Sequence, residues 1–505
     1  MKKLIFTFST ILAAVCLQAQ EITPTDGLRY SMESLTGTAR FRAMSGAFGA
    51  LGGDLSSLNI NPAGSAFFNH NQATISLSSL NNRNSARYFG TKTVDTDSNL
   101  DLNQAGAVFV FVNKDSNSAW KKMSLGINYE NNNSNFDNQL RTKGVNPLHS
   151  IDRYFLRFAN GLPNEGGIFL DVLENASFEE LNFIDQQAFL GFQGYLFNPV
   201  SNNPNNTLYV SNVPAGDYYH DNKTVTNGYN GKLTGNFATS YKDRIYFGIN
   251  LNAHFSEFTN SQSMYEAYNN NSASGLRSVQ FDTETYTLGS GFSFSLGAIG
   301  KITDDLRIGL AFESPTWYNL RDEQRQRIIT YCADCDSRNP VIFDPRITMV
   351  YDSYKLQTPS KWTGSIAYTF QKRGLISFDY AIKDYSSVRF KPKSDSYYNS
   401  LNSYMSDNFD TAIEYRIGAE YKIKEWSLRG GYRFEESPYK NDVALGDLKG
   451  YSGGIGYNFG DSRLDLAYNY QRRKFNQALI SSGMTDPSRI TAINNNVTLS
   501  YSINF

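Results

Sequence analysis

The C-terminal segment of the chain alternates strictly between apolar and polar side chains. Its apolar positions are Val497, Leu499, Tyr501, Ile503 and Phe505, and a polar residue stands between each pair. A period of two is typical of a β-strand whose two faces meet different surroundings, whereas an amphipathic helix needs spacings of three and four. In a transmembrane β-barrel, such alternation places one set of side chains in lipid and the other in the lumen. The segment therefore predicts a barrel strand.

The same pattern recurs along the chain and predicts fourteen strands. We expect them at residues 71–80, 104–112, 121–130, 232–241, 244–256, 282–298, 304–315, 361–370, 375–384, 411–422, 425–435, 450–459, 462–472 and 495–505. Short connections such as Lys242-Asp243 join alternate pairs, and bacterial outer-membrane barrels have their short turns on the periplasmic side. The stretch 346–356 also resembles a strand, but counting it would place the short turns outside. We therefore assign it to one external loop, 316–360, and predict an all-β, antiparallel transmembrane barrel over residues 71–505.

The composition fits a barrel and disfavours other classes of protein. The chain has 33 Tyr, 35 Phe and 39 Gly among 505 residues, yet its mean hydropathy is only −0.44. Lipid-facing and lumen-facing residues of a barrel average out in this way. A net charge of −1 gives no electrostatic basis for binding nucleic acid. The 4 His show no metal-ligand spacing, and we predict no catalytic residues, no metal site and no cofactor.

The N-terminus predicts export. Two lysines precede an apolar run from Leu4 to Cys16, and Ala19 supplies a small residue at a cleavage position. This order is typical of a secretory signal peptide, and the run is too short to span a bilayer as a helix. We expect residues 1–19 to be removed after Ala19 and the mature chain to lie in the outer membrane of a Gram-negative-type envelope. The residues before Cys16 make a poor lipobox, so we do not expect a lipid anchor there.

Residues 20–70 do not alternate, and we interpret them as a plug inside the barrel. They are rich in glycine and alanine, which permit close backbone packing and tight turns. Near their end stands Asn61-Pro62-Ala63-Gly64, in which Pro62 restricts its own φ and the conformation of Asn61. This combination, directly before the first strand, resembles the hatch of the FadL/TodX (OmpP1-type) outer-membrane transporters. The motif resemblance covers residues 37–66, and the barrel matches that family in strand count and topology.

The resemblance implies a channel for passive uptake of hydrophobic small molecules, above all long-chain fatty acids. In that family, external loops capture the ligand, movement of the hatch helps to release it, and a strand that kinks inward opens a gap in the wall. Asn61, Pro62, Ala63 and Gly64 would then belong to the gate, while the sequence does not locate the kinked strand. The partners implied are outer-membrane lipid and a hydrophobic ligand such as a fatty acid. The alternative that stays open is an outer-membrane adaptor for protein secretion or surface attachment, a role of some fourteen-stranded relatives.

Residues 131–231 form a connection of about a hundred residues, far longer than an ordinary loop. Apolar residues recur in it at spacings of three and four, which predicts one or two amphipathic helices on the extracellular side. These residues are Phe178, Leu181, Ile184, Ala188, Phe192 and Tyr195. They would either line a groove that captures the ligand or pack on each other and cap the barrel mouth. The sequence does not separate these alternatives.

Three arginines fall on the lumen side of adjacent predicted strands. They are Arg416, Arg429 and Arg433. A guanidinium suits a fatty-acid carboxylate because it can donate two parallel hydrogen bonds to it. Ordinary ion pairing with lumen glutamates such as Glu414 and Glu420 is the competing interpretation.

The predicted barrel region contains two further signals, one in an external loop and one at the C-terminus. Cys332 and Cys335 lie in the external loop 316–360, where a small structural disulfide is expected outside the cell. A zinc site at this position would need two more ligands. Phe505 closes an alternating aromatic strand, which is the type of signal that the barrel-assembly machinery of outer membranes recognises, and we expect that machinery to be a partner.

Overall fold

The computed structural model describes residues 22–115, 117–131, 136–161, 166–268, 275–335, 339–371, 373–441, 443–480 and 482–505. The predicted signal peptide, its cleavage position at Ala19 and Cys16 lie outside these residues. None of the helices in the described ranges is long and apolar enough to cross a bilayer.

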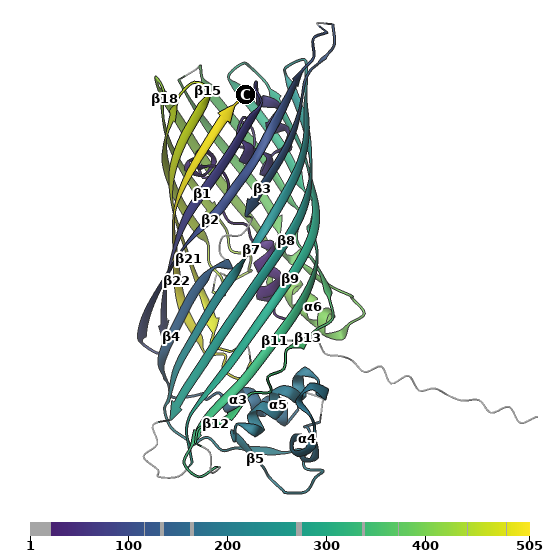
Figure 1. The fold of residues 1–505 in the computed structure, drawn as a ribbon, viewed down its shortest axis with the longest axis vertical. Helices are drawn as coiled ribbons and strands as arrows, with labels where there is room; N and C mark the ends of the chain where they lie inside the picture. The colour runs from purple at the N-terminus through teal and green to yellow at the C-terminus, as the bar shows by residue number, and fades with distance from the viewer. Residues whose placement is uncertain are drawn as a thin grey trace, which may run out of the picture.

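The described strands form a closed antiparallel barrel (Figure 1). The first strand, β1 (Gln72–Tyr88), pairs with β2 (Thr91–Val112) on one side and with the last strand, β22 (Pro487–Asn504), on the other. This closure leaves no open sheet edge, which is what hydrocarbon demands, because it offers no water to unpaired N–H and C=O groups. The other wall segments are β3 (Trp120–Asn131), β4 (Asn138–Asn146), β7 (Tyr218–Tyr241), β8 (Ile245–Tyr268), β9 (Leu276–Lys301), β10 (Leu306–Glu313), β11 (Trp317–Cys332), β14 (Tyr354–Gln357), β15 (Lys361–Phe370), β16 (Gly374–Asp384), β17 (Arg389–Lys391), β18 (Thr411–Ile423), β19 (Trp426–Glu435), β20 (Leu448–Asn458) and β21 (Ser462–Ala478).

Several wall strands are interrupted, so the wall has more strand segments than strands. β10 and β11 both pair with β9, one after the other along its length. On their other side, β10 pairs with β15 and β11 pairs with β14. When β3 with β4 and β16 with β17 are likewise taken as single strands, the wall is a closed 14-strand barrel. The predicted number of strands is therefore confirmed.

Apolar side chains point outward from the wall and small polar ones point inward. On β22, the Leu499 side chain is 45% exposed while that of its neighbour Ser500 is 1% exposed. This distribution of apolar and polar side chains is the reverse of that in a water-soluble protein, and it suits a wall whose outer face contacts lipid. Tight turns such as those between β7 and β8 and between β18 and β19 lie at the end where the chain terminates, and we assign that end to the periplasm.

The strands extend farther on the extracellular side than the sequence analysis predicts. β1 and β2 continue to a two-residue turn at Phe89 and Gly90, whose φ angles of 41° and 84° suit a tight hairpin. The prediction ends these strands at residue 80 and starts the next at 104. The reason for the difference is that the intervening residues are mostly polar, so hydrophobicity no longer alternates along them.

The predicted external loop 316–360 is wrong in its local structure for the same reason. Residues 317–332 form β11, which pairs along β9, and the end of the rejected stretch 346–356 enters β14. The number of wall strands is unchanged, because β11 continues the strand begun by β10 and β14 continues into β15. Short segments β12 (Val341–Phe343) and β13 (Met349–Val350) also pair with β11. Within 131–231, β4 and the outer part of β7 likewise take residues assigned to a loop.

The segment that precedes β1 lies inside the barrel, and we call residues 22–70 the hatch. Its helices are α1 (Pro24–Ser31), α2 (Ala39–Ala43) and the 3-10 helices η1 (Leu55–Asn59) and η2 (Pro62–Phe67). Thr38 caps α2 by accepting a hydrogen bond from the Phe41 amide, and Asn61 caps η2 in the same way from the Ala63 amide. The hatch contacts separate strands of the wall, since Ala39 donates to Ser500 of β22 while Asn236 of β7 donates to the Pro62 carbonyl.

Two helical regions lie toward the extracellular side. We call residues 147–217 the cap, which contains α3 (Asp152–Ala159), α4 (Leu170–Asn175), the 3-10 helix η4 (Phe178–Glu180), α5 (Phe183–Gln193) and the hairpin of β5 (Phe197–Pro199) and β6 (Tyr209–Ser211). Figure 1 shows α3, α4 and α5 gathered beyond the end of the barrel opposite the C-terminus. A second helix, α6 (Ser396–Asn408), follows the 3-10 helix η5 (Tyr385–Ser387) and begins at Asp395, which accepts hydrogen bonds from two amides of its first turn.

Candidate functional site

The Asn61-Pro62 turn holds the hatch to itself and to the wall. The buried Asn61 side chain donates to the Gly49 carbonyl at 2.8 Å and to the Ala298 carbonyl of β9 at 3.1 Å. Its oxygen accepts from the Ala63 amide at 3.1 Å. One amide side chain thus joins two hatch segments and a wall strand, so the predicted gating turn lies at the contact between hatch and barrel. Its role in gating stays a prediction.

Two wall glycines make this close contact possible. A Cβ at Gly248 of β8 would stand 2.3 Å from the Pro62 carbonyl carbon, and one at Gly297 of β9 would stand 2.0 Å from the Asn61 side-chain oxygen. Both distances are far shorter than atoms permit, so any larger residue would displace the hatch turn. The hatch therefore packs directly on the backbone of these strands.

Buried charges join the hatch to the opposite part of the wall. Glu420 of β18 accepts from Arg40 of the hatch at 2.9 Å and from Arg429 of β19 at 2.6 Å, and Arg429 also pairs with Asp465 at 2.7 Å. A second cluster forms around Glu33, whose carboxylate binds two wall lysines, Lys361 at 2.5 Å and Lys383 at 2.9 Å. Each charge of the hatch here meets an opposite charge of the wall, which is the condition for burying ions without a large loss of stability.

The three predicted lumen arginines point inward, and each is paired with protein carboxylates. Arg416 binds Glu414 at 2.7 Å, and Arg433 binds Glu414 at 2.5 Å and Glu435 at 2.8 Å. Arg429 belongs to the Glu420 cluster described above. The geometry is that of the competing interpretation, ion pairing within the lumen, and a role in binding a ligand carboxylate stays a prediction.

An apolar cluster fills the lumen on the extracellular side of these charges. We call it the lumen cluster; it comprises Ile22, Leu28, Tyr30, Phe136, Phe258, Tyr318, Leu320, Tyr354, Leu356, Tyr385, Val388, Phe390, Tyr398, Leu401, Met405, Phe409 and Ala412. The hatch helix α1 contributes Leu28 and Tyr30, and the Tyr30 and Tyr318 rings lie 5.1 Å apart. Sequence reasoning missed this cluster because its members come from α1, α6 and several separate strands.

The third wall strand is broken next to the lumen cluster. β3 pairs with β2 as far as Glu130 opposite Gln104, whereas β4 pairs with β7. β4 instead lies against lumen-facing side chains of β1, since Asn84 donates to the Gln139 carbonyl at 2.7 Å and Asn82 donates to the Asp137 carbonyl at 2.8 Å. β4 therefore lies farther inside the barrel than β3, and we call this displacement the inward bend; sequence reasoning could not place it.

Phe136 connects the break to the interior. It is 1% exposed, and its ring lies 5.0 Å from the Phe258 ring and 6.0 Å from the Tyr30 ring. Within the described residues, the β2 segment 91–103 ladders only with β1. The inward bend thus leaves one edge of β2 free of a strand partner at the height of the lumen cluster, and we call this place the wall break.

The six residues predicted to capture a ligand all belong to the apolar core of the cap. Phe178 and Ala188 are buried, and Leu181, Ile184, Phe192 and Tyr195 are partly buried against the same core. Phe178 also lies 6.3 Å from Phe343, close to the barrel rim. Their main contacts are with each other and with the strands, as expected of a cap, while a capture role stays a prediction. Among cap carboxyls, burial raises the pKa of Asp152, although Ser211 donates a hydrogen bond to it.

The remaining sequence signals have simple structural positions. Cys332 and Cys335 are joined by a disulfide at the extracellular end of β11. The Phe505 amide donates to the Asn71 carbonyl, and its exposed ring lies 6.1 Å from Phe109 on the lipid-facing side. Recognition of Phe505 by assembly machinery stays a prediction.

One enzyme-like motif escaped the sequence analysis. Residues 450–454 read Gly-Tyr-Ser-Gly-Gly, the spacing of a hydrolase nucleophile turn. That motif needs a sharp turn between a strand and a helix, whereas these residues lie within β20. The Ser452 hydroxyl donates to the Ala43 carbonyl at 2.9 Å and meets the Ser45 hydroxyl at 2.7 Å. Ser452 therefore helps to hold the hatch, and its surroundings give no sign of a nucleophile.

Comparisons with known proteins agree with this architecture. A family model described as outer membrane protein transport protein (OMPP1/FadL/TodX) matches residues 202–504, which is more than half of the chain. The structure resembles a Pseudomonas aeruginosa FadL homologue with a TM-score of 0.54 at 13% identity, covering 94% of this chain and 100% of that one. It also resembles the Pseudomonas putida toluene transporter TodX with a TM-score of 0.50 at 13% identity, covering 94% and 99%. No curated protein matches. At these identities the structural likeness shows the fold alone.

We predict that Gly248→Ala loosens the hatch without unfolding the barrel. The new methyl group must displace the Pro62 backbone, and such overpacking costs about 1–3 kcal/mol. Trypsin should then cut at the hatch arginines roughly five to a hundred times faster, because cleavage follows the population of the open form. The heat-modifiable gel shift of a folded barrel should persist. Gly235→Ala on β7 is the control, since a Cβ there meets no atom within 4 Å. Equal cleavage rates for both variants would contradict the contact.

We predict that Glu420→Gln is strongly destabilising. The substitution keeps the size of the side chain but leaves Arg40 buried without its carboxylate, and breaking a buried pair costs about 3–5 kcal/mol. The urea midpoint of the folded protein in detergent should fall accordingly. Glu323→Gln is the matched control, because Glu323 pairs with Arg321 on the exposed surface, where such pairs contribute at most about 1 kcal/mol. Similar midpoints for the two variants would argue against a structural role of the Glu420 cluster.

Proposed function

Because this chain belongs to the family of outer membrane protein transport proteins (OMPP1/FadL/TodX), we propose that it is a passive channel by which hydrophobic small molecules cross the outer membrane. The family membership supports a hydrophobic-compound channel in the outer membrane. The identity of the compound and its path are the parts that we propose from the geometry.

The observation that supports the proposal best is the lumen cluster beside the wall break. A channel for polar solutes needs a polar, water-filled lumen. This barrel instead holds a mostly aromatic and aliphatic cluster between cap and hatch, and Phe136 extends that cluster to the strand that bends inward. An apolar ligand in the cluster would replace contacts with side chains of similar polarity, and it would lie near the edge of β2 that has no strand partner among the described residues.

The proposed path has three stages. The apolar core of the cap, including Phe178 and Phe192, captures the ligand at the extracellular mouth. The ligand then enters the lumen cluster, where it takes space now filled by Leu28 and Tyr30 of α1. Release follows either sideways through the wall break or past the hatch after its movement. Because α1 is part of the hatch, displacement of α1 would couple ligand entry to movement of the hatch.

We propose long-chain fatty acids as the ligand class, with aromatic hydrocarbons as the competing class. An acyl chain would pack against the apolar side chains of the lumen cluster. The competing class enters because a solved structure of the same fold is a toluene transporter, and because aromatic rings dominate the lumen cluster. Both classes are therefore included in the test.

Uptake by cells with and without the protein tests the proposed function, with labelled oleate, toluene and sucrose as solutes. We expect protein-dependent uptake of oleate and none of sucrose. Uptake of toluene in place of oleate would assign the channel to aromatic hydrocarbons. No uptake of either by a barrel shown to be folded would contradict the channel and favour the secretion adaptor.

We predict that Phe136→Asp lowers the rate of uptake at least about tenfold. A carboxylate in the lumen cluster must be desolvated or must hold water there, and either outcome opposes an apolar ligand by more than about 1.4 kcal/mol. Phe89→Asp is the matched control, because the same change falls on an exposed turn at the tip of the β1–β2 hairpin. An unchanged rate in the Phe136 variant, with normal folding, would exclude the path beside the wall break.

Deletion of Asn61, Pro62 and Ala63 tests the gate. We predict that uptake falls while the heat-modifiable barrel still forms, because the deletion removes the turn that joins the hatch to β8 and β9 but no wall strand. The measurement is the initial rate of oleate uptake at matched amounts of folded protein. Undiminished uptake would count against a gating role for this turn.

A further inference from the structure

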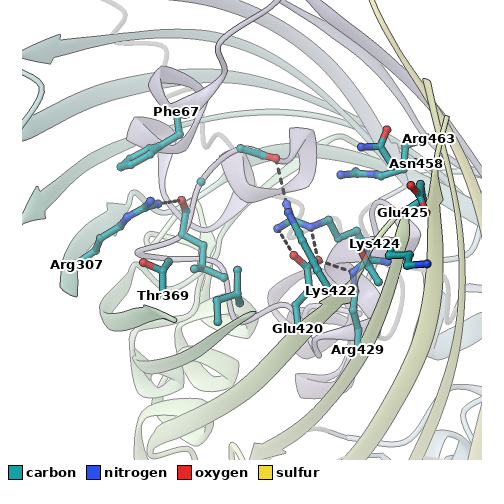
Figure 2. Close-up of a pocket in the computed structure, with 16 residues that line it drawn as sticks. Phe67, Arg307, Thr369, Glu420, Lys422, Lys424, Glu425, Arg429, Asn458 and Arg463 are labelled. Atoms are coloured by element: carbon teal, nitrogen blue, oxygen red, sulfur yellow. Dashed lines mark hydrogen bonds and ion pairs between the residues drawn. The ribbon is translucent and has the colours of Figure 1, made fainter. Parts of the chain in front are cut away.

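A cavity of about 350 Å³ lies at the periplasmic end, between the hatch and the ends of several wall strands (Figure 2). We call it the periplasmic pocket. Its hatch side is formed by Arg40, Leu51, Gly52, Gly53 and Phe67, and its wall side by residues of β10, β15, β16, β18, β19, β20 and β21. The proposed hydrophobic path gives this cavity no role.

The lining of the pocket is strongly basic. The basic side chains are Arg40, Arg307, Lys422, Lys424, Arg429 and Arg463, and the acidic ones are Glu420 and Glu425. Three of the arginines are neutralised inside the protein by three carboxylates. Arg40 and Arg429 share Glu420, and Arg463 pairs with Asp465 at 2.6 Å and with Asp54 at 4.0 Å. Within the described part of the chain, Arg307, Lys422 and Lys424 have no carboxylate at ion-pair distance. The pocket therefore keeps an excess of positive charge even after Glu425 is counted.

Arg307 is arranged as a binding group with an unused donor. One guanidinium nitrogen donates to the Leu51 carbonyl at 2.8 Å, and the guanidinium carbon lies 4.6 Å from the centre of the Phe67 ring. These two contacts hold the side chain in place. Its Nε is buried and has no hydrogen-bond partner among the described residues. Because the Nε has almost no accessible surface, a ligand in the cavity would contact the rest of the Arg307 guanidinium.

The shape and polarity of the pocket suit an anionic group with a short apolar attachment. Arg307 lies on one side of the cavity, and Lys422 and Lys424 lie across from it (Figure 2). Phe67, Leu51 and Leu375 supply apolar surface in the same lining. Lysine and arginine bind carboxylates and phosphates by charge-assisted hydrogen bonds, which are stronger than neutral ones.

We propose that the periplasmic pocket binds an anionic oxygen headgroup, a carboxylate or a phosphate, with Lys422, Lys424 and Arg307 as its direct ligands. The anion comes either from an amphiphile that has passed the barrel, in which case the site rests on the proposed function, or from free anions of the periplasm. Because Arg307 also donates to Leu51, and Arg40 donates to the Gly53 carbonyl at 3.1 Å, a bound anion competes for groups that hold hatch residues 51–53.

Equilibrium dialysis of the purified full-length protein in detergent tests the proposal, with labelled octanoate, 1-octanol and inorganic phosphate as probes. The test variant is Lys422→Gln with Lys424→Gln, which removes two charges and little volume. The matched control is Lys114→Gln with Lys242→Gln, since both lysines are exposed at periplasmic turns and neither lines the pocket. The heat-modifiable gel shift establishes that every sample is folded.

We expect octanoate to bind at least about tenfold more weakly to the test variant than to the control, because the loss of even one charge-assisted hydrogen bond reduces affinity by about that factor. Binding of 1-octanol should be equal in both, because it reports the apolar lumen cluster. Phosphate binding that falls in parallel supports the site and assigns it to free anions as well, whereas octanoate alone assigns it to amphiphiles. Unchanged binding of both octanoate and phosphate in the test variant would overturn the proposal. Dialysis needs no passage across a membrane, so this site and the uptake function can fail independently.

Discussion

The wall of this protein depends on one constraint, which is that backbone N–H and C=O groups in hydrocarbon must pair with each other. Pairing of β1 with β22 satisfies it by closing the sheet. Closure then separates the side chains into two environments, so Leu499 meets lipid while Ser500 meets the lumen. A polar lumen follows directly, and with it a place where the charges and amide groups of the hatch can be bound.

The hatch is held by the polar groups that closure places inside. Asn61 reaches the backbone of β9, Asp379 accepts hydrogen bonds from the Phe48 and Gly49 amides, and Glu420 joins Arg40 to the wall. Such contacts are strong when complete and costly when one partner is lost. Polar contacts of this kind also exchange with water or ligand more readily than an interdigitated apolar core does. The movement proposed for the hatch is therefore more compatible with these groups than with an interface of leucine and phenylalanine.

The sequence predicts those parts of the structure in which burial follows from local pattern. β18, β19, β21 and β22 were predictable because lipid and lumen alternate along them. The outer half of β2 was not, because residues 91–103 are mostly polar and hydrophobic alternation ends there. The lumen cluster was hidden for a different reason, since Tyr30, Phe258 and Tyr398 meet only after the barrel closes. The inward orientation of Arg416 was predictable from the alternation of side chains along β18. Its partner Glu414 could be chosen among the lumen glutamates only from the structure.

The order of environments along the lumen favours different exits for different molecules. The lumen cluster is apolar and adjoins the wall break at Phe136, whereas the layer below it contains the Glu33 and Glu420 charge clusters. A hydrocarbon that leaves through the wall break would reach lipid without passing those charge clusters. Contact with the charges would not stabilise a hydrocarbon. A carboxylate would have to shed its hydration to enter the lipid interior, so for it the charged hatch layer and the basic pocket beneath form the less costly surroundings. Under the proposed function, a neutral ligand would therefore leave by the lateral path, whereas the head of an amphiphile would follow the axial path toward the periplasmic pocket.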